Sequence, residues 1–453
     1  MNLKFRHYTA CIAAAVCITP ALAQTSLERR AEIEKEYGVK DAIVKYDTKA
    51  DLMKELYRTG AEYFMYPYDE AVMTPAPKGY KPFYISYTGR HGARYAIKDD
   101  IYEKVRGLLK NSHEAGNLTE AGENLYRRYE AFYPNVAHRG GDLTIKGQEQ
   151  LHFIANTLYR NFPEVFKGKT RAEVLSTPVP RVLMTMLCFL DEIRTLDNDF
   201  EYSVDTGRKY LPVLEPNGSK NPYRVEVPAT KAYRESAAAM KASRIDAEAF
   251  CSRYFHDTDS LERAYGRFNF EDNMRSIVMD MQCIDDASAS DSMMDIFTPE
   301  ELFNLWEVRN YNAYLFWGFS PLADNRSVTN NAAILKDIME HAEKNFASGD
   351  VQLDLRFTHD TAVLPLVSFM RLNNFGAVID NPDDVKDFWR SDQIPMASNL
   401  QLIFFRSKKS SEILVKVLYN GHEAALPIEE ASPSFYSWNT FREFYGRLIA
   451  EIK

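Results

Sequence analysis

The stretch Pro82-Phe83-Tyr84-Ile85-Ser86-Tyr87-Thr88-Gly89-Arg90-His91-Gly92-Ala93-Arg94 indicates the fold class of this chain. Its first six residues are apolar and aromatic, as in a short buried strand, and Thr88-Gly89 is expected to end that strand. In an open α/β sheet, ligands bind beyond the carboxyl ends of the strands. The charged residues that follow this strand are therefore the first candidates for a functional site.

Two further predicted strands are also followed by ionisable residues. Residues 173–176 form a short strand, and Arg181 comes after the prolines that follow it. Residues 353–357 form another strand, with His359 and Asp360 just beyond its end. Because the ends of parallel strands meet at one edge of a sheet, we expect these groups to converge.

The rest of the chain favours an α/β fold with a mixed, mostly parallel central sheet flanked by helices. Residues 399–406 and 412–419 alternate around a polar turn, as in a hairpin. Helical patterns are expected at 48–63, 118–132, 144–165, 181–195, 298–318, 328–346 and 440–452.

The predicted sheet core comprises residues 24–200 and 300–453. Residues 201–299 are rich in polar helical patterns with few strand signals, which predicts an inserted, mainly helical cap. Two helices elsewhere open with the same pattern, Leu-Thr-x-x-Gly, at Leu118–Gly122 and Leu143–Gly147. The threonines suit helix N-caps.

Composition narrows the class of protein. The chain has 453 residues, of which 26% are charged and 45% hydrophobic, and its net charge is −9. This is typical of a globular protein and argues against broad nucleic-acid binding, which needs a basic surface. No apolar run reaches the about 18 residues of an ordinary membrane span.

Residues 1–23 have the features of a secretory signal peptide. A basic start with Lys4 and Arg6 is followed by an apolar stretch that ends in Ala21-Leu22-Ala23. We expect cleavage after Ala23 and a periplasmic or secreted protein. A buried N-terminal helix and a lipid anchor at Cys17 are the alternatives.

The cysteines do not suggest a disulfide scaffold. Cys11 and Cys17 leave with the signal peptide, so Cys188, Cys251 and Cys283 remain. One bridge, between Cys251 and Cys283, and three free thiols are both compatible with this number. No CxxC, HExxH or EF-hand pattern is present in the sequence, so no metal is expected.

The residues at the strand ends together predict an anion site. Three converging guanidinium groups, from Arg90, Arg94 and Arg181, repel one another unless an anion lies between them. Guanidinium pairs well with phosphate oxygens. The same positive charge keeps His91 neutral, and a neutral imidazole is a nucleophile. Asp360 is then placed as a general acid for the leaving group.

These motifs resemble those of the histidine acid phosphatases, the secreted branch of the histidine phosphatase superfamily. That family carries RHGxRxP near its first strand and HD or HAE near its last, and this chain reads Arg90–Ala96 and His359-Asp360-Thr361. Arg181 and the stretch Leu143–Gln150 also match recurrent features of the family. The family's proline is replaced by Ala96, which we expect the chemistry to tolerate.

The resemblance implies a phosphoglycerate mutase-like fold, no cofactor and no metal. It implies that His91 forms a covalent phosphohistidine and that Asp360 donates the proton. The phosphate is then held by Arg90, Arg94, Arg181 and His359. Arg94-Tyr95 and Leu364-Pro365-Leu366 are closer to the multiple inositol polyphosphate phosphatases, whereas those enzymes commonly have HAE where this chain has His359-Asp360.

The leading hypothesis is a phosphomonoesterase acting on small-molecule phosphate esters, with inositol polyphosphates such as phytate as candidate substrates. A phosphotransferase or mutase that uses the same phosphohistidine is the second hypothesis. A non-catalytic phospho-ligand binding protein is the third, although binding alone needs neither His91 nor Asp360. The cap is expected to select the substrate, and no motif in it indicates which.

Overall fold

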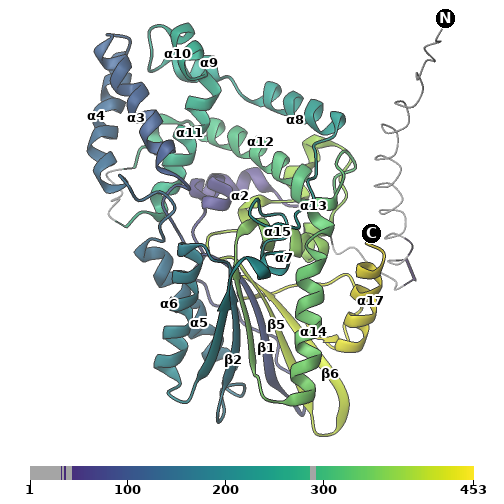
Figure 1. Ribbon diagram of the computed structural model, residues 1–453. Helices are drawn as coiled ribbons and strands as arrows, with labels where there is room; N and C mark the ends of the chain where they lie inside the picture. Colours follow the sequence, from purple (N-terminus) through teal and green to yellow (C-terminus); the bar gives the residue numbers. More distant parts are fainter. Residues whose placement is uncertain (1–31, 33–34, 37–42, 286–291, 453) are drawn as a thin grey trace, which may run out of the picture.

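A computed structural model describes residues 32, 35–36, 43–285 and 292–452 of the chain (Figure 1). The predicted signal peptide, with Cys11 and Cys17, lies outside the described residues. The central sheet fans out in the lower half of Figure 1, and most of the helices of residues 231–317 lie above it.

The sheet has the strand order β3-β2-β4-β1-β5-β6-β7, and β8 pairs with β6. The first four strands in this order are parallel, whereas β5 and the strands after it are antiparallel. The predicted mixed sheet is thus confirmed, with a substantial antiparallel part. The strands span β1 Tyr80–Arg90, β2 Arg171–Ser176, β3 Glu201–Thr206, β4 Leu353–Thr358, β5 Asn399–Ser407, β6 Ser410–Tyr419, β7 His422–Glu423 and β8 Tyr436–Ser437.

Strand β3 corrects the boundary that we expected at residue 201. It pairs with β2 along its whole length and therefore belongs to the central sheet. All six of its residues are exposed. An edge strand without a buried apolar face does not show the hydrophobic pattern that identifies a strand in a sequence, which is why the sequence placed it in the cap.

Helices cover both faces of the sheet. On one face, α5 (Ile145–Asn161) and α6 (Pro180–Leu196) share a core with Ile85 and Tyr87 of β1. On the other, α14 (Ala332–Ser348), α15 (Asp360–Phe369) and α17 (Trp438–Ala450) share a second core with β5 and β6. Alternate residues of β5 contribute to the two cores, as the two-residue period of a strand requires.

A third core lies in the helical layer above the sheet. It joins α3 (Asp99–Glu114) and α4 (Glu120–Phe132) to residues of 245–305. That later segment includes α9 (Ala247–Ser252), α10 (Thr258–Ala264), α11 (Arg267–Asp280) and the start of α12 (Pro299–Trp317). Figure 1 shows α3 and α4 in this layer with α9–α11. The sequence did not predict α3, and residues 99–132 were assigned to the sheet core.

The remaining helices connect these layers. The predicted helix at 48–63 divides into α2 (Thr48–Lys54) and the 3-10 helix η1 (Leu56–Tyr63). Thr119 and Thr144 cap α4 and α5, as predicted. The shorter α-helices are α7 (Leu211–Leu214), α13 (Arg326–Thr329) and α16 (Val385–Phe388), and α8 spans Lys231–Arg244.

Cys188, Cys251 and Cys283 are buried free thiols, so the Cys251–Cys283 bridge does not form. None of the helices in the described part of the chain is both long and apolar enough to cross a membrane.

A buried charge network joins strand β4 to helix α14. Arg356 is fully buried and forms ion pairs of 2.6 Å with both Asp354 and Asp337. His341 Nδ1 lies 3.4 Å from the Asp354 carboxylate. The hydrogen bond to Asp354 raises the pKa of His341. Burial disfavours the charged form of Asp354, but Arg356 and His341 outweigh it and lower its pKa.

The first prediction is a pH-dependent loss of stability in His341→Gln. Because the folded state raises the pKa of His341, its contribution is complete below the unfolded pKa of about 6.5 and is lost as pH rises through the folded value. We expect the variant to lose about 1 kcal/mol of unfolding free energy near pH 5.5 and much less near pH 9, measured by urea denaturation. An equal loss at both pH values would contradict the ion pair. The control is His113→Gln, at an exposed histidine that forms an ion pair with Glu123.

Candidate active site

The ends of three parallel strands form the floor of the site. The register pairs Arg90 of β1 with Thr358 of β4, and Ser176 of β2 with Phe357. The backbone N–H of His91 continues the ladder by donating to the Thr358 carbonyl at 3.1 Å. The predicted convergence of these strand ends is therefore present in the structure.

The start of helix α5 holds the loop that follows β1 in place. The Ala93 carbonyl accepts from the backbone N–H and the hydroxyl of Thr144, at 3.0 and 3.1 Å, and the Ala93 N–H donates to Gln150 at 2.8 Å. A Cβ on Gly92 would lie 2.3 Å from the Gly147 carbonyl oxygen, and one on Gly147 would lie 2.2 Å from that of Ala93. The motif Leu143–Gln150 thus serves to dock this loop.

Arg90 is fully buried with only part of its guanidinium group satisfied. Its Nη1 donates to the carbonyls of Glu62, Ile394 and Pro395, at 2.8 to 3.0 Å. Nε and Nη2 have no hydrogen-bond partner in the described structure, and Nη2 lies 3.7 Å from Asp360. One edge of the group is therefore anchored, while the other has donors available for a ligand.

Arg94 and Arg181 are arranged in a similar way. Arg94 Nη1 donates to the Tyr95 carbonyl at 2.9 Å, and its guanidinium lies over the Tyr63 ring. Arg181 Nη2 lies 3.4 Å from His359 Nδ1. The Nε atoms of both arginines are buried without a partner among the described residues. Burial and then Arg94 lower the pKa of Arg181 to about 10.

His91 is held as a neutral imidazole. Its ring Nδ1 lies 2.8 Å from the Gly92 carbonyl, which can only accept, so Nδ1 carries the proton and Nε2 keeps its lone pair. The side chain is 1% exposed. Burial, followed by the charges of Arg181 and Arg90, holds the pKa of His91 well below its usual value. This combination of tautomer and charge is what a nucleophilic histidine requires.

His359 lies beside His91, with 5.6 Å between the ring centroids. Its Nε2 lies 3.2 Å from the Thr177 hydroxyl. Burial and then Arg181 lower the pKa of His359 to about 3, so the ring is neutral at ordinary pH.

Asp360 is the first residue of α15, where the helix dipole favours a negative charge. Its side chain is 23% exposed, whereas Arg90, Arg94 and the two histidines are buried. Burial disfavours the carboxylate, but Arg90 and Arg94 outweigh this effect and lower the pKa of Asp360. In the absence of an anion the group is therefore ionised. The structure thus brings all six predicted residues together.

The sequence did not identify the residues that support this cluster from other segments. Glu62 at the end of η1 forms an ion pair with Arg309 of α12, and Arg309 also lies over the Tyr63 ring. Glu215, after α7, lies 3.9 Å from His359, and burial followed by Asp360 raises its pKa. None of these residues follows a strand or belongs to a motif, so only the tertiary structure reveals them.

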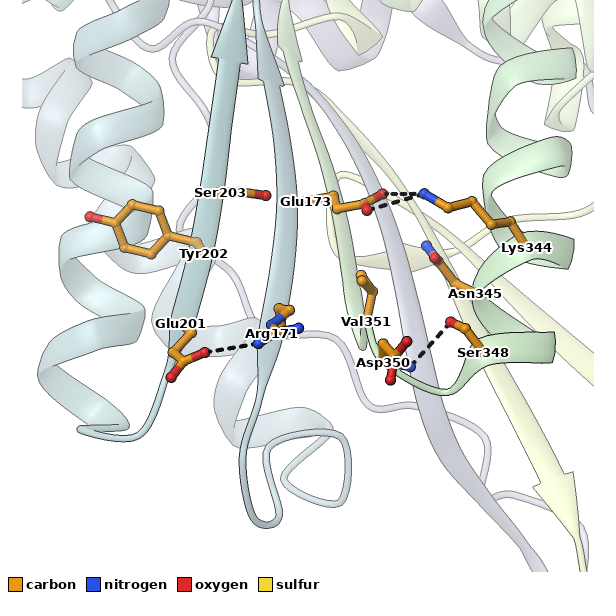
Figure 2. A pocket seen from close by; sticks show the side chains of 10 residues that line it. All are labelled: Arg171, Glu173, Glu201, Tyr202, Ser203, Lys344, Asn345, Ser348, Asp350 and Val351. Carbon is orange, nitrogen blue, oxygen red and sulfur yellow. Dashed lines mark hydrogen bonds and ion pairs between the residues drawn. The ribbon is translucent and has the colours of Figure 1, made fainter.

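A surface hollow lies away from this cluster. A cavity of about 510 Å³ is found at the amino ends of β2, β3 and β4, at the opposite end of the strands from Arg90 (Figure 2). Four of its charged side chains pair with one another, Lys344 with Glu173 and Arg171 with Glu201, as the dashed lines in Figure 2 mark, and Asp350 also lines it. This cavity therefore contributes nothing to the cluster of arginines and histidines.

No group of three or more histidine, cysteine, aspartate or glutamate side chains in the described ranges is arranged to hold a metal ion. The unpartnered donors described above instead form a site for an anion.

Comparison with known proteins identifies the family. The model for the histidine phosphatase superfamily (branch 2) matches residues 89–420. The chain belongs to this family. The match contains every residue of the predicted site, from Arg90 to Asp360.

Solved structures share the fold at low sequence identity. The multiple inositol polyphosphate phosphatase of Bifidobacterium longum, in complex with inositol hexasulfate, has a TM-score of 0.65 at 16% identity, covering 84% of this chain and 96% of that one. The phytase of D. castellii has a TM-score of 0.62 at 15% identity, covering 87% and 86%. The Hafnia alvei phytase in complex with tartrate has a TM-score of 0.52 at 12% identity, covering 83% and 98%. A comparison with curated protein sequences gave no match.

The second prediction concerns the contact between Gly147 and the loop after β1. Gly147→Ala forces a Cβ against the Ala93 carbonyl and displaces His91 from the arginines. A shift of about 1 Å is enough to reduce kcat/KM for a phosphate ester by about 100-fold. The control is Gly107→Ala in α3, where the added Cβ meets nothing within 4 Å. Full activity of Gly147→Ala would show that this contact does not place the loop.

Proposed function

We propose that the protein is a phosphomonoesterase that hydrolyses small-molecule phosphate esters through a phosphohistidine on His91. The observation that supports this most directly is the tautomer of His91 within the arginine cluster. Its Nδ1 proton is engaged by the Gly92 carbonyl, so Nε2 is the nucleophilic atom. A binding protein needs the arginines but no nucleophile of this kind.

The arginine cluster supplies the affinity for phosphate. Arg90 Nε and Nη2, Arg94 Nε and Arg181 Nε are buried donors without partners in the described structure. A buried donor without an acceptor costs about 1–3 kcal/mol, so these groups favour an oxygen-rich dianion strongly. They also hold the charge that the phosphoryl oxygens carry during transfer.

The first chemical step breaks the ester bond. His91 Nε2 forms a bond to phosphorus as the bond from phosphorus to the ester oxygen breaks, and that oxygen leaves with its electron pair. Asp360 in its acid form transfers a proton to the leaving oxygen, which departs as an alcohol. His359, neutral and beside His91, exchanges its Nε2 contact with the Thr177 hydroxyl for a hydrogen bond to the phosphoryl group.

The second step returns the enzyme to its starting state. The Asp360 carboxylate accepts a proton from a water molecule whose oxygen attacks phosphorus. The bond from Nε2 to phosphorus breaks, and inorganic phosphate is released. The exposure of Asp360 gives this water access. No step requires a metal ion, so we expect activity to be insensitive to chelators.

Inositol polyphosphates are the substrate class that we propose first, because the similar structures described above are a multiple inositol polyphosphate phosphatase and two phytases. The chain carries an expected signal peptide at 1–23, which supports action in the periplasm or outside the cell. An exported enzyme of this kind would act on esters that arrive from the surroundings.

The third prediction tests the nucleophile. We expect His91→Ala to lose at least about 1,000-fold in phosphate release from phytate and from an aryl phosphate, since the proposed covalent intermediate forms on this ring. Wild-type release should be unchanged by a chelator. The matched control is His152→Ala, a histidine that pairs with Glu192 away from the site. If His91→Ala hydrolysed esters as fast as the wild type, the mechanism would be wrong.

The fourth prediction tests Asp360 as the acid. The arginines lower its pKa in the empty site, but a bound phosphate dianion offsets their charge and raises that pKa. Because the acid form is the active one, kcat should fall as pH rises through the pKa of Asp360 in the complex.

In Asp360→Asn, we expect the single-turnover rate of leaving-group release from an alkyl phosphate, which reports on the first step alone, to fall by about 100-fold or more, with a smaller loss for p-nitrophenyl phosphate, whose leaving group needs no proton. The descending limb of the pH profile should disappear for the good leaving group. Equal losses for both esters would remove Asp360 from this role.

A further inference from the structure

A turn of unusual backbone geometry lies beside the arginine cluster. Ala61, within η1, has a φ of 54° and a ψ of −116°, a combination that glycine adopts readily and that a residue with a Cβ adopts only at a cost. This residue is fully buried. Backbone strain of this kind persists only where the surrounding structure holds it in place, so the contacts of the turn indicate its role.

The two residues after Ala61 contact two arginines of the site directly. The Glu62 carbonyl accepts from Arg90 Nη1 at 2.8 Å. The Tyr63 ring lies under the guanidinium of Arg94, with 5.5 Å between Arg94 Cζ and the ring centroid. Arg90 Nε and Nη2 have no hydrogen-bond partner among the residues that the structure describes. The direction of these free donors therefore depends in part on the position of the Glu62 carbonyl.

Helix α12 covers this turn with one of its faces. Phe303 and Trp306 share a small buried core with Ala61. Arg309 Nε donates to the Glu62 carboxylate at 3.0 Å, and Arg309 Nη2 pairs with the second carboxylate oxygen. The three residues of α12 are spaced three positions apart, so they follow one face of the helix. The same face thus contacts both the strained residue and the residue after it.

Two other contacts hold the chain beyond Glu62. The Tyr63 carbonyl accepts from the Cys283 thiol at 3.3 Å. The Phe64 carbonyl accepts from the Met396 N–H at 2.7 Å. These contacts fix the backbone at residues 63 and 64, whereas the ion pair with α12 fixes the side chain of Glu62.

We propose that Glu62 is a positioning residue for the anion site. Its ion pair with Arg309 holds the strained turn at Ala61, and the turn held in this way keeps the Glu62 carbonyl against Arg90 Nη1. The proposal rests on the proposed function only in taking the arginine cluster as the anion site. It does not depend on the covalent step.

Removal of the Glu62 carboxylate distinguishes this role from a purely electrostatic one. The loss of a negative charge near the arginines favours the binding of an anion, and it also releases Arg309 to attract that anion. The loss of a positioning contact weakens the binding, because Arg90 then has to be oriented when the anion arrives. The two effects on anion affinity therefore have opposite signs.

The experiment measures the binding of inorganic sulfate to the purified protein by calorimetry at a single pH. In Glu62→Met, which removes both acceptor oxygens, we expect the affinity to fall by about 10-fold, as for one lost hydrogen bond to a charged group. Glu62→Gln keeps one acceptor oxygen for Arg309 and should show a smaller fall in affinity. This milder variant decides the question if Glu62→Met does not fold.

Glu307 supplies a matched control in the same helix. Its carboxylate accepts from Arg244 Nε at 2.8 Å and from Arg244 Nη2 at 3.2 Å, so it forms the same kind of two-point ion pair. This pair joins α12 to α8 and not to the turn. Glu307→Met should lose unfolding free energy in urea denaturation, as Glu62→Met does, but should keep the wild-type affinity for sulfate.

A second substitution tests the strain itself. Glycine adopts the backbone angles of residue 61 without the cost that alanine carries. Adding Ala61→Gly to Glu62→Met should therefore recover about 3-fold or more of the lost sulfate affinity, because the turn keeps its shape without the ion pair. A general loss of stability would not be repaired in this way, since the substitution also removes a buried methyl group.

The proposal is overturned if the Glu62 variants bind sulfate as tightly as the wild type or more tightly, if Glu307→Met loses as much affinity, or if Ala61→Gly recovers none of it. Tighter binding would make Arg309 an anion-binding group instead. A wild type that binds sulfate but releases no phosphate from esters would contradict the proposed function alone, because sulfate binding requires no turnover. A wild type that does not bind sulfate would overturn both proposals.

Discussion

Three guanidinium groups held close together in a largely buried site are the constraint on which the rest of the structure depends. Arg90 and Arg94 are almost entirely buried, and Arg181 is half-buried beside them. Cations at this spacing repel one another, and burial deprives them of the water that would screen the repulsion. The fold therefore has to hold them in place and leave their free donors directed toward a shared anion.

The protein meets this constraint with backbone carbonyls and with acidic groups around the site. Arg90 is anchored on three carbonyl oxygens, which hold it in direction without neutralising it. Glu62 in the N-terminal segment forms an ion pair with Arg309, and Asp280, a buried carboxyl group at the end of α11, adds negative charge near Arg94. Asp360 faces the cluster directly, and its exposure allows it to exchange protons with a substrate or with water.

The positive charge of the arginines favours the neutral form of a histidine and the ionised form of an aspartate. It keeps His91 and His359 neutral, because a second positive charge beside the arginines is unfavourable. It keeps Asp360 ionised until a dianion arrives. In the proposed mechanism, one electrostatic arrangement prepares both the nucleophile and the proton donor, and the binding of the substrate's phosphate changes the protonation state of the donor.

Sequence alone determined the strands whose carboxyl ends carry Arg90, Arg181 and His359, because short apolar runs followed by charged residues are local signals. The sequence also showed the motif Leu143–Gln150, but not that this motif contacts the loop after β1. It missed the edge strand β3, whose residues are all exposed, and it also missed α3, although Tyr102, Val105 and Leu109 recur at the spacing of one helix face. Only the tertiary structure decided which distant groups meet the cluster: Glu62, Glu215, Asp280 and Arg309. Their proximity depends on long-range packing of the cap and the N-terminal segment onto the sheet, and no local pattern of residues records such contacts.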